Sequence, residues 1–326
     1  MRKIAPAVVV AATILLTLLP LFGGTFRVEQ MTRILIYVIL AASLDLMIGY
    51  TGLVNMGHAA FFGIAAYSAA VLADKWGMAN VFIGLPLSLA AAAIASLIVG
   101  MVTVRLSGIY FIMATLAFTQ IVFFLIHDGT WAGGSDGLLV TADIKAQIGG
   151  ATLFDLGNLH QRYYITLAAA AIVLLGLFRL VDSPFGRALQ GIRENQQRMR
   201  ALGYRVNLYK LVSFVISGTL AGLAGYLYFA LTNFADPTLT YWLQSAQIMV
   251  MTVLGGTGTL IGPALGAAFF TLFIDWSSEL TDHWKLYLGI VVVAATLFAP
   301  GGFWNGLRYS IAKLLSIRRQ REETSA

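Results

Sequence analysis

Ten apolar runs, separated by short polar segments, make up most of this chain. Several are near the roughly 20 residues that a helix needs to cross about 30 Å of hydrocarbon, and others are shorter. We therefore predict an all-α polytopic membrane bundle of about ten transmembrane or partly re-entrant helices, in a single domain over residues 1–326. The runs cover residues 5–22, 34–50, 56–73, 81–104, 109–126, 163–181, 211–231, 243–254, 261–276 and 286–299.

Composition places the chain in a bilayer. Hydrophobic residues make up 59% of it and charged residues only 11%, which leaves little room for a soluble catalytic domain. The net charge of +6 comes from basic residues between the apolar runs, so membrane orientation explains it better than nucleic-acid binding. Cysteine is absent, which excludes a disulfide framework or a thiolate metal site.

The first run could be a secretory signal, because Met1, Arg2 and Lys3 precede it. The stretch "LLPLFGGTF" lacks the small residues of a cleavage site, with Phe22 three positions before any cut after Gly24. An uncleaved first span is the better interpretation.

Basic residues predict the orientation. If all ten runs cross and the N-terminus is cytoplasmic, fifteen lysines and arginines lie inside and six outside. This positive-inside bias places both termini in the cytoplasm, together with a loop at residues 183–210 and a basic tail at 304–326. A long loop at residues 129–162 would be extracytoplasmic.

Two glycine-rich breaks interrupt the apolar pattern. They are "GYTGLVNMGHAAFFG", from Gly49 to Gly63, and "GGTGTLIGPALGAAFF", from Gly255 to Phe270. Both contain Gly-x-Thr-Gly and a later Ala-Ala-Phe-Phe, which is compatible with an internal repeat and also with chance. Discontinuous helices of this kind often line a transport route, whereas a single glycine more often allows close helix packing.

Polar residues within the runs are candidates for the substrate pathway. Asp45 is the main ionisable one, with Asp275 near the other end of a later run. Asp45 could instead be a structural partner for helix ends or for a cytoplasmic arginine, and each polar residue alone could join neighbouring helices. The full candidate set is Asp45, Asn55, His58, Thr119, Gln120, Gln247 and Thr257.

The segment "GRALQGIRENQQRMRALGYR" combines five arginines with an amphipathic pattern. Ser183 can cap a helix that Pro184 opens and Gly203 closes. Four apolar residues then share one stripe: Leu189, Ile192, Met199 and Leu202. Such a helix could rest on anionic lipid, or its stripe could fill a groove on a soluble partner.

This segment, continued to "VNLYKLVSFVISGTLAGLAGYLY", resembles the cytoplasmic loop and following helix of branched-chain amino acid ABC transporter permeases of the LivM type. Further blocks agree in order: "GYTGLVNMGHAAFFGIAAY", "GIYFIMATLAFTQI", "GGSDGL", "GGTGTLIGPALGA" and "APGGFWNGL". The resemblance covers residues 44–307 and implies the ABC importer permease fold. The segment would be the coupling helix that seats in a cleft of the ATPase subunit. Its implied docking residues are Arg187, Ile192, Arg193, Glu194, Asn195, Ala201, Leu202 and Gly203.

The resemblance also implies partners and location. These are two ATP-binding subunits, a second homologous permease and an extracytoplasmic amino-acid-binding protein, in a bacterial inner membrane. The cargo would be leucine, isoleucine, valine or a similar small amino acid, moved by alternating access. Many relatives carry a small residue and an acid where Met199 and Arg200 stand here.

Sequence motifs for chemistry are missing. No lysine follows a glycine, so the chain has no Gly-x-x-x-x-Gly-Lys-Ser/Thr loop, and we expect ATP to be used by the partner subunits alone. We expect no catalytic residues, no metal and no cofactor in this chain. The alternatives are an ion-coupled secondary transporter, a scaffold protein, or an ABC permease for urea or sugars.

Overall fold

The computed structural model describes residues 4–22, 24–141, 144–148, 151–281, 283–298 and 301–304. The predicted basic tail lies outside these residues from position 305 onward, and so do Met1, Arg2 and Lys3.

The described chain is mostly helical, and every predicted apolar run overlaps a helix, which confirms the all-α bundle. Several helices begin earlier than their runs, most of all α3, whose first turns are formed by the more polar residues from Thr25 to Arg33. The helices are α1 (Ile4–Thr17), α2 (Leu19–Phe22), α3 (Thr25–Asp45), α4 (His58–Trp76), α5 (Val81–Thr103), α6 (Ile109–His127), α7 (Leu159–Asp182), α8 (Pro184–Glu194), α9 (Gln196–Ala201), α10 (Val206–Thr232), α11 (Trp242–Gly255), α12 (Ile261–Leu280) and α13 (Trp284–Phe298).

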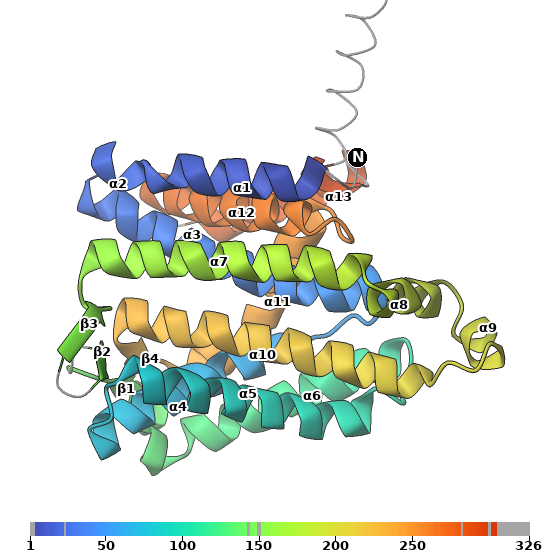
Figure 1. Cartoon of the computed structure of the whole chain (residues 1–326), viewed down its shortest axis with the longest axis horizontal. Coiled ribbons are helices and arrows are strands. Elements are labelled where there is room, and N and C mark those ends of the chain that lie inside the picture. Colours follow the sequence, from blue (N-terminus) through green and yellow to red (C-terminus); the bar gives the residue numbers. More distant parts are fainter. Residues whose placement is uncertain are drawn as a thin grey trace, which may run out of the picture.

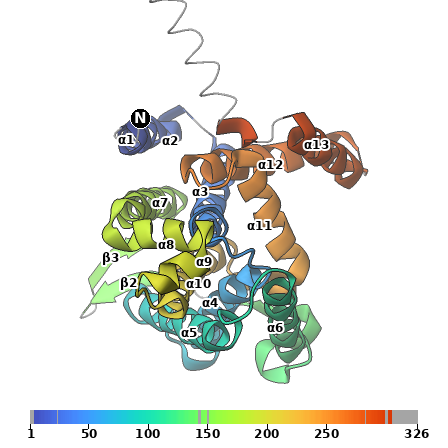
Figure 2. The ribbon, with the colours of Figure 1, turned by 90° about the vertical axis from the view of Figure 1, so that its right-hand side faces the viewer.

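Most of the long helices run along one axis (Figure 1). The short helices α8 and α9 form one end of the bundle, and a β-hairpin of β2 (Lys145–Ile148) and β3 (Ala151–Asp155) forms the other. We call these the α8–α9 end and the hairpin end. The end-on view shows α12 and α13 on one side of the bundle and α4, α5 and α6 on the opposite side (Figure 2).

Helices α3 and α10 form the centre. Helix α3 packs against α7, α10, α11 and α12, and α10 packs against α3, α4 and α5. Small residues let α10 approach its neighbours closely. A Cβ at Gly222 would overlap the side chain of Ala92, and one at Gly225 would overlap the backbone of Phe62. For these glycines the packing interpretation holds.

The predicted loop at 129–162 is shorter than expected, because α7 begins at Leu159 after the Asn158 side chain caps it. Its residues take part in two antiparallel strand pairs that the sequence pattern did not predict. Strand β1 (Leu138–Leu139) pairs antiparallel with β4 (Phe234–Ala235), and β2 pairs antiparallel with β3. Residues 142, 143, 149 and 150 of this loop lie outside the described ones.

The segment 183–210 is two helices, and the expectation of a single helix is wrong. Ser183 Oγ accepts from the Gly186 N–H at 3.3 Å, and Gly203 ends the second helix with φ +86°. The chain breaks at Asn195, whose backbone is extended and whose Oδ1 caps α9 through Arg198 N–H at 2.9 Å. Asparagine favours this arrangement because its short amide competes with the helical backbone. Residues from Val206 onward belong to α10.

Five helical segments among the described residues are long and apolar enough to span a membrane. They are Thr25–Thr51, Val81–Thr103, Ile109–His127, Leu159–Asp182 and Val206–Thr232. Helix α11, with 14 residues, is shorter than a full span. The expectation that all ten apolar runs cross the membrane completely therefore remains a prediction.

Candidate functional site: the junction of two broken helices

The first glycine-rich break reverses the chain inside the bundle. Helix α3 continues into a π-helical turn, Leu46–Thr51, and Gly52 then adopts a left-handed conformation with φ +75°. Residues 53–57 return without regular structure, and α4 starts at His58, whose Nε2 lies 2.7 Å from Ser43 Oγ. Ser43 precedes the end of the π turn by eight residues, or about 12 Å of helix. Helix α4 therefore begins at depth in the bundle, as predicted for a discontinuous helix.

Polar side chains from α6 and α11 hold this returning segment. Thr115 Oγ1 accepts from Met56 N–H at 3.2 Å, and Thr119 Oγ1 donates to the Met56 carbonyl at 3.2 Å. Ser245 Oγ accepts from Ala59 N–H at 2.9 Å, which satisfies one of the free N–H groups at the start of α4. The unwound backbone is thus stabilised by hydroxyl groups, as interrupted membrane helices require.

The second break lies between α11 and α12. Gly256, Gly258 and Leu260 all have positive φ, at +108°, +78° and +60°. A positive φ is unusual for leucine, so surrounding contacts must hold it. Thr259 supplies one, because its Oγ1 accepts from Gly262 N–H at 3.0 Å and donates to the Gly256 carbonyl at 2.9 Å.

Asp45 joins the two breaks. Its Oδ1 accepts from Gly258 N–H at 2.7 Å and its Oδ2 from Leu260 N–H at 3.1 Å, and the side chain is fully buried. A Cβ at Gly49 would overlap both the Asp45 carboxylate and the Gly258 backbone, so this close approach requires glycine. Both carboxylate oxygens therefore bind the backbone of the other break, which matches the structural alternative raised for Asp45.

Arg193, at the end of α8, completes the junction. Its Nη1 donates to the Gly49 carbonyl. The aliphatic part of its side chain lies against Gly52, and Nη1 would be 3.4 Å from a Cβ at Gly258. One arginine of the α8–α9 segment therefore binds the first glycine-rich break and lies close to the second, and much of it remains exposed.

The predicted docking residues fall into two groups. Ile192 and its stripe neighbour Leu189 are fully buried and pack within the chain's own bundle, so the expectation that they fill a partner's groove is wrong. They are buried because α8 packs against α7, the π-helical turn and α10. The remaining residues are exposed: Arg187, Arg193, Glu194, Asn195, Ala201, Leu202 and Gly203.

The other pathway candidates are dispersed. Asn55 Oδ1 accepts from Gly57 N–H at 2.8 Å and so shapes the first break. Gln120 on α6, Gln247 on α11 and Thr257 in the second break are half-buried. The Gln120 Oε1 atom is buried and has no partner among the described residues. None of these geometries tests contact with a substrate, so their role in the pathway stays a prediction.

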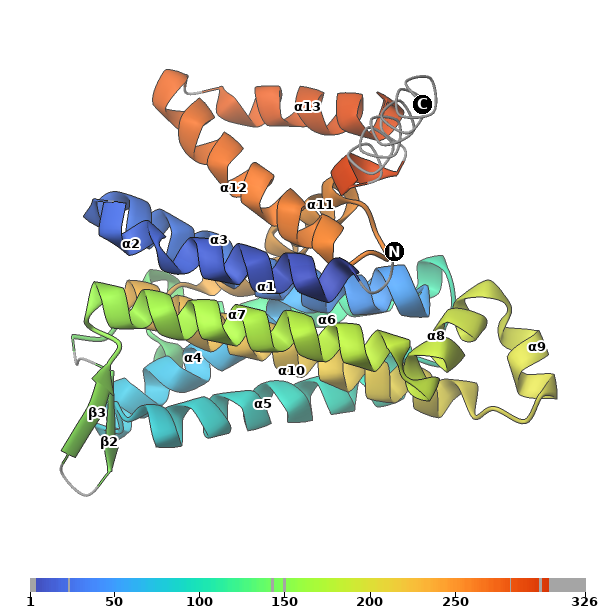
Figure 3. The same ribbon diagram turned by 45° about the horizontal axis from the view of Figure 1, so that its top comes forward.

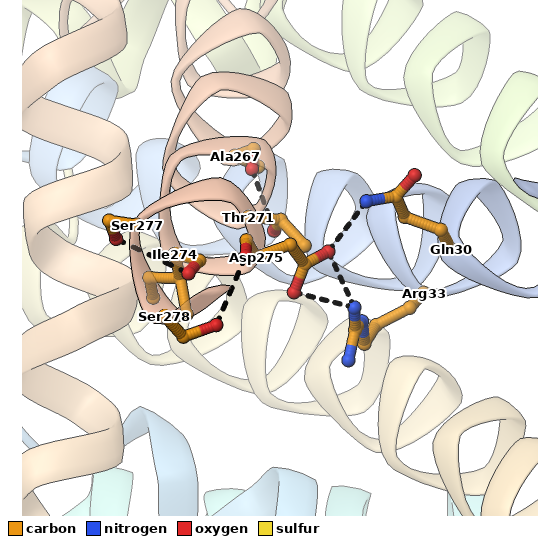
Figure 4. A network of polar contacts seen from close by, with 8 residues as sticks. All are labelled: Gln30, Arg33, Ala267, Thr271, Ile274, Asp275, Ser277 and Ser278. Atoms are coloured by element: carbon orange, nitrogen blue, oxygen red, sulfur yellow. Dashed lines mark hydrogen bonds and ion pairs between the residues drawn. The ribbon is translucent and has the colours of Figure 1, made fainter. Parts of the chain in front are cut away.

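An ion pair toward the hairpin end also connects α3 and α12. Arg33 Nη2 lies 2.8 and 2.7 Å from the two Asp275 carboxylate oxygens, and Gln30 Nε2 donates to Asp275 Oδ2 at 2.8 Å (Figure 4). The sequence pattern indicated Asp275 as an ionisable residue within a span but assigned Arg33 to a loop. Arg33 and Asp275 are 242 positions apart, and nothing in the local pattern indicated that they pair.

These features define a polytopic membrane protein of interrupted helices, and comparison with known proteins assigns it to a family. Residues 26–299 match the family model described as the branched-chain amino acid transport system / permease component. The chain belongs to this family. No solved structure matches it.

Individual relatives agree with this assignment. The chain is 30% identical over 319 residues to the high-affinity branched-chain amino acid transport system permease protein LivM of Escherichia coli K12, covering 90% of this chain and 73% of the relative. LivM of Salmonella typhimurium LT2 is 30% identical over 309 residues, covering 87% and 71%. The autoinducer 2 import system permease protein LsrC of Photorhabdus laumondii is 25% identical over 266 residues, covering 75% and 74%.

Proposed function

We propose that this chain is the membrane-spanning subunit of an ATP-driven importer for branched-chain or similar small amino acids. One observation carries the mechanism: Arg193, in the segment that resembles a coupling helix, donates to Gly49 beside the contact between the two broken helices. A partner that displaces this segment would act directly on both breaks. Alternating access needs such a connection, because a ligand or motor changes a conformational equilibrium only through contacts that differ between its states.

The orientation follows from the same segment. If α8 and α9 dock on ATPases, the α8–α9 end is cytoplasmic and the hairpin end faces outward, where a binding protein would deliver the substrate. Both termini would be cytoplasmic in a bacterial inner membrane, in agreement with the charge bias. Two ATP-binding subunits would supply ATP hydrolysis, and a second homologous permease would complete the membrane part.

The docking surface of this proposal is α9 and the residues after it. Helix α9 projects farthest from the bundle in Figure 1. Leu202 is 66% exposed there, among exposed Arg198, Arg200 and Arg205. An exposed leucine surrounded by arginines suits a groove with an apolar floor and an acidic rim.

Substitution of Leu202 tests the docking surface. We expect Leu202→Asp to abolish co-purification of the ATPases without changing the amount of permease in the membrane, because it places a carboxylate in an apolar contact. Leu153→Asp is the matched control, since Leu153 is 63% exposed on β3 at the opposite end of the molecule. Normal co-purification with Leu202→Asp would contradict docking through this surface.

Transport distinguishes the substrate classes. Proteoliposomes with the permease pair, the ATPases and the binding protein should take up labelled leucine only with internal ATP, and unlabelled isoleucine or valine should compete. The family description supports this cargo. Competition by urea or a sugar but not by leucine would favour the alternative ABC permeases. Uptake by this chain alone under an ion gradient would favour a secondary transporter.

A further inference from the structure

Helices α3 and α12 are fastened to each other at two separate levels. Near the α8–α9 end, Asp45 of α3 binds the backbone N–H groups of Gly258 and Leu260, immediately before α12. Nearer the hairpin end, Arg33 of α3 binds Asp275 of α12. Arg33 and Asp45 are twelve residues apart, or about 18 Å of helix. Two attachments this far apart resist sliding and tilting of one helix against the other.

The two attachments differ in burial and in their hydrogen bonds, and each of them holds α3 and α12 together. The Asp45 contact is fully buried and uses two charge-assisted hydrogen bonds, which are among the stronger kind. The Arg33–Asp275 pair is partly exposed, with side chains 37% and 19% accessible, and Gln30 adds a third hydrogen bond to it. Charged groups at this depth are costly beside lipid, so their mutual contact favours the paired arrangement of α3 and α12.

Arg193 is attached to the same pair. Its guanidinium donates to the Gly49 carbonyl at the end of α3, within reach of Gly258 in the loop that leads to α12. Displacement of α8 along the bundle would therefore move the ends of both helices together. The apolar contacts of Leu189 and Ile192 strengthen the attachment, because they seat α8 against the bundle.

We propose that α3 and α12 form one lever, and that Arg193 is the positioning residue that joins this lever to the cytoplasmic segment. This inference rests on the proposed function. Movement of α8 by the ATPases is carried by α3 and α12 to the Arg33–Asp275 level, close to the extracytoplasmic side. The residue acts through the backbone of the two breaks and not through contact with the substrate.

The first test measures coupling in the complete reconstituted complex. Arg193→Gln removes the charge, and we expect the complex to assemble in normal amounts while leucine transported per ATP hydrolysed falls at least about tenfold, or about 1.4 kcal/mol. Arg193→Lys retains a positive donor and should restore part of the ratio. Arg179→Gln, at an exposed arginine that ends α7, is the matched control and should keep the wild-type ratio.

Two outcomes of this experiment would overturn the proposal. A wild-type ratio in Arg193→Gln would show that the contact carries no coupling. Loss of ATPase from the Arg193→Gln complex would show that Arg193 binds the partner directly. If the wild-type complex neither assembles with ATPases nor transports leucine, the proposed function itself fails, which is a different result.

The second test measures the lever directly. The chain has no cysteine, so introduced cysteines can carry spin labels without background. Labels at Phe26 in the first turn of α3, Leu280 at the end of α12 and Phe82 in the first turn of α5 use exposed positions. During ATP turnover the Phe26–Leu280 distance should stay constant while the Leu280–Phe82 distance changes. A Phe26–Leu280 distance that changes as much as the other would refute a rigid lever.

Discussion

The Asp45 contact allows a quantitative prediction. Replacing Asp45 with alanine removes the acceptor for two N–H groups, that of the half-buried Gly258 and that of the buried Leu260. A hydrogen bond to a charged group contributes about 1.5–3 kcal/mol, so two such bonds amount to about 3–6 kcal/mol of local stability. Since about 1.4 kcal/mol is a factor of ten, the second break should open roughly two to four orders of magnitude more often.

Hydrogen exchange followed by mass spectrometry measures this opening in peptides that cover residues 254–262. Asp45→Ala should raise exchange there by the stated amount, and Asp45→Asn, which keeps one acceptor oxygen, should raise it by roughly one to two orders of magnitude. Asp74→Ala is the control, because Asp74 is exposed at the end of α4. Unchanged hydrogen exchange in Asp45→Ala would mean that other contacts hold the second break and that Asp45 does not join the two breaks.

Two further predictions concern helix contacts. Asp275→Asn should lower the free energy of unfolding, measured by denaturant titration, by about 1 kcal/mol, since the pair is partly exposed. The double variant Arg33→Asp with Asp275→Arg should restore part of this free energy. A double variant less stable than the single one would argue against pairing. Gly225→Ala should destabilise by about 1–3 kcal/mol, because its Cβ meets the Phe62 backbone. Gly176→Ala, with open space at its Cβ, should be neutral or stabilising, and equal effects of both would refute the packing argument.

The consequences for transport follow from where the hydroxyl and carboxylate groups lie. The breaks are held by contacts between different helices, such as Thr119 with Met56 and Ser245 with Ala59. Each contact can be exchanged for another when the helices shift, because hydroxyl groups accept and donate in several directions. The proposed alternating access would require the junction to hold more than one arrangement.

The helices and the two breaks could be predicted from the amino-acid sequence alone. Apolar runs near the length of a membrane span leave only helices as stable structures, because backbone groups in lipid must find partners within their own segment. Ser183 as a cap and Gly203 as an end were also readable locally, since each depends on neighbouring backbone alone. The charge pattern gave the expected orientation on the same local basis.

Which side chains meet depends on the packing of the helices. Asp45 and Gly258 are 213 positions apart, and Arg33 and Asp275 are 242 apart, so no local pattern could pair them. Ile192 is buried because α8 packs against α7 and α10, and periodicity along one ideal helix could not include those neighbours. Sequence sets what each segment forms, whereas contacts between segments depend on helix packing, which brings distant residues within hydrogen-bond reach.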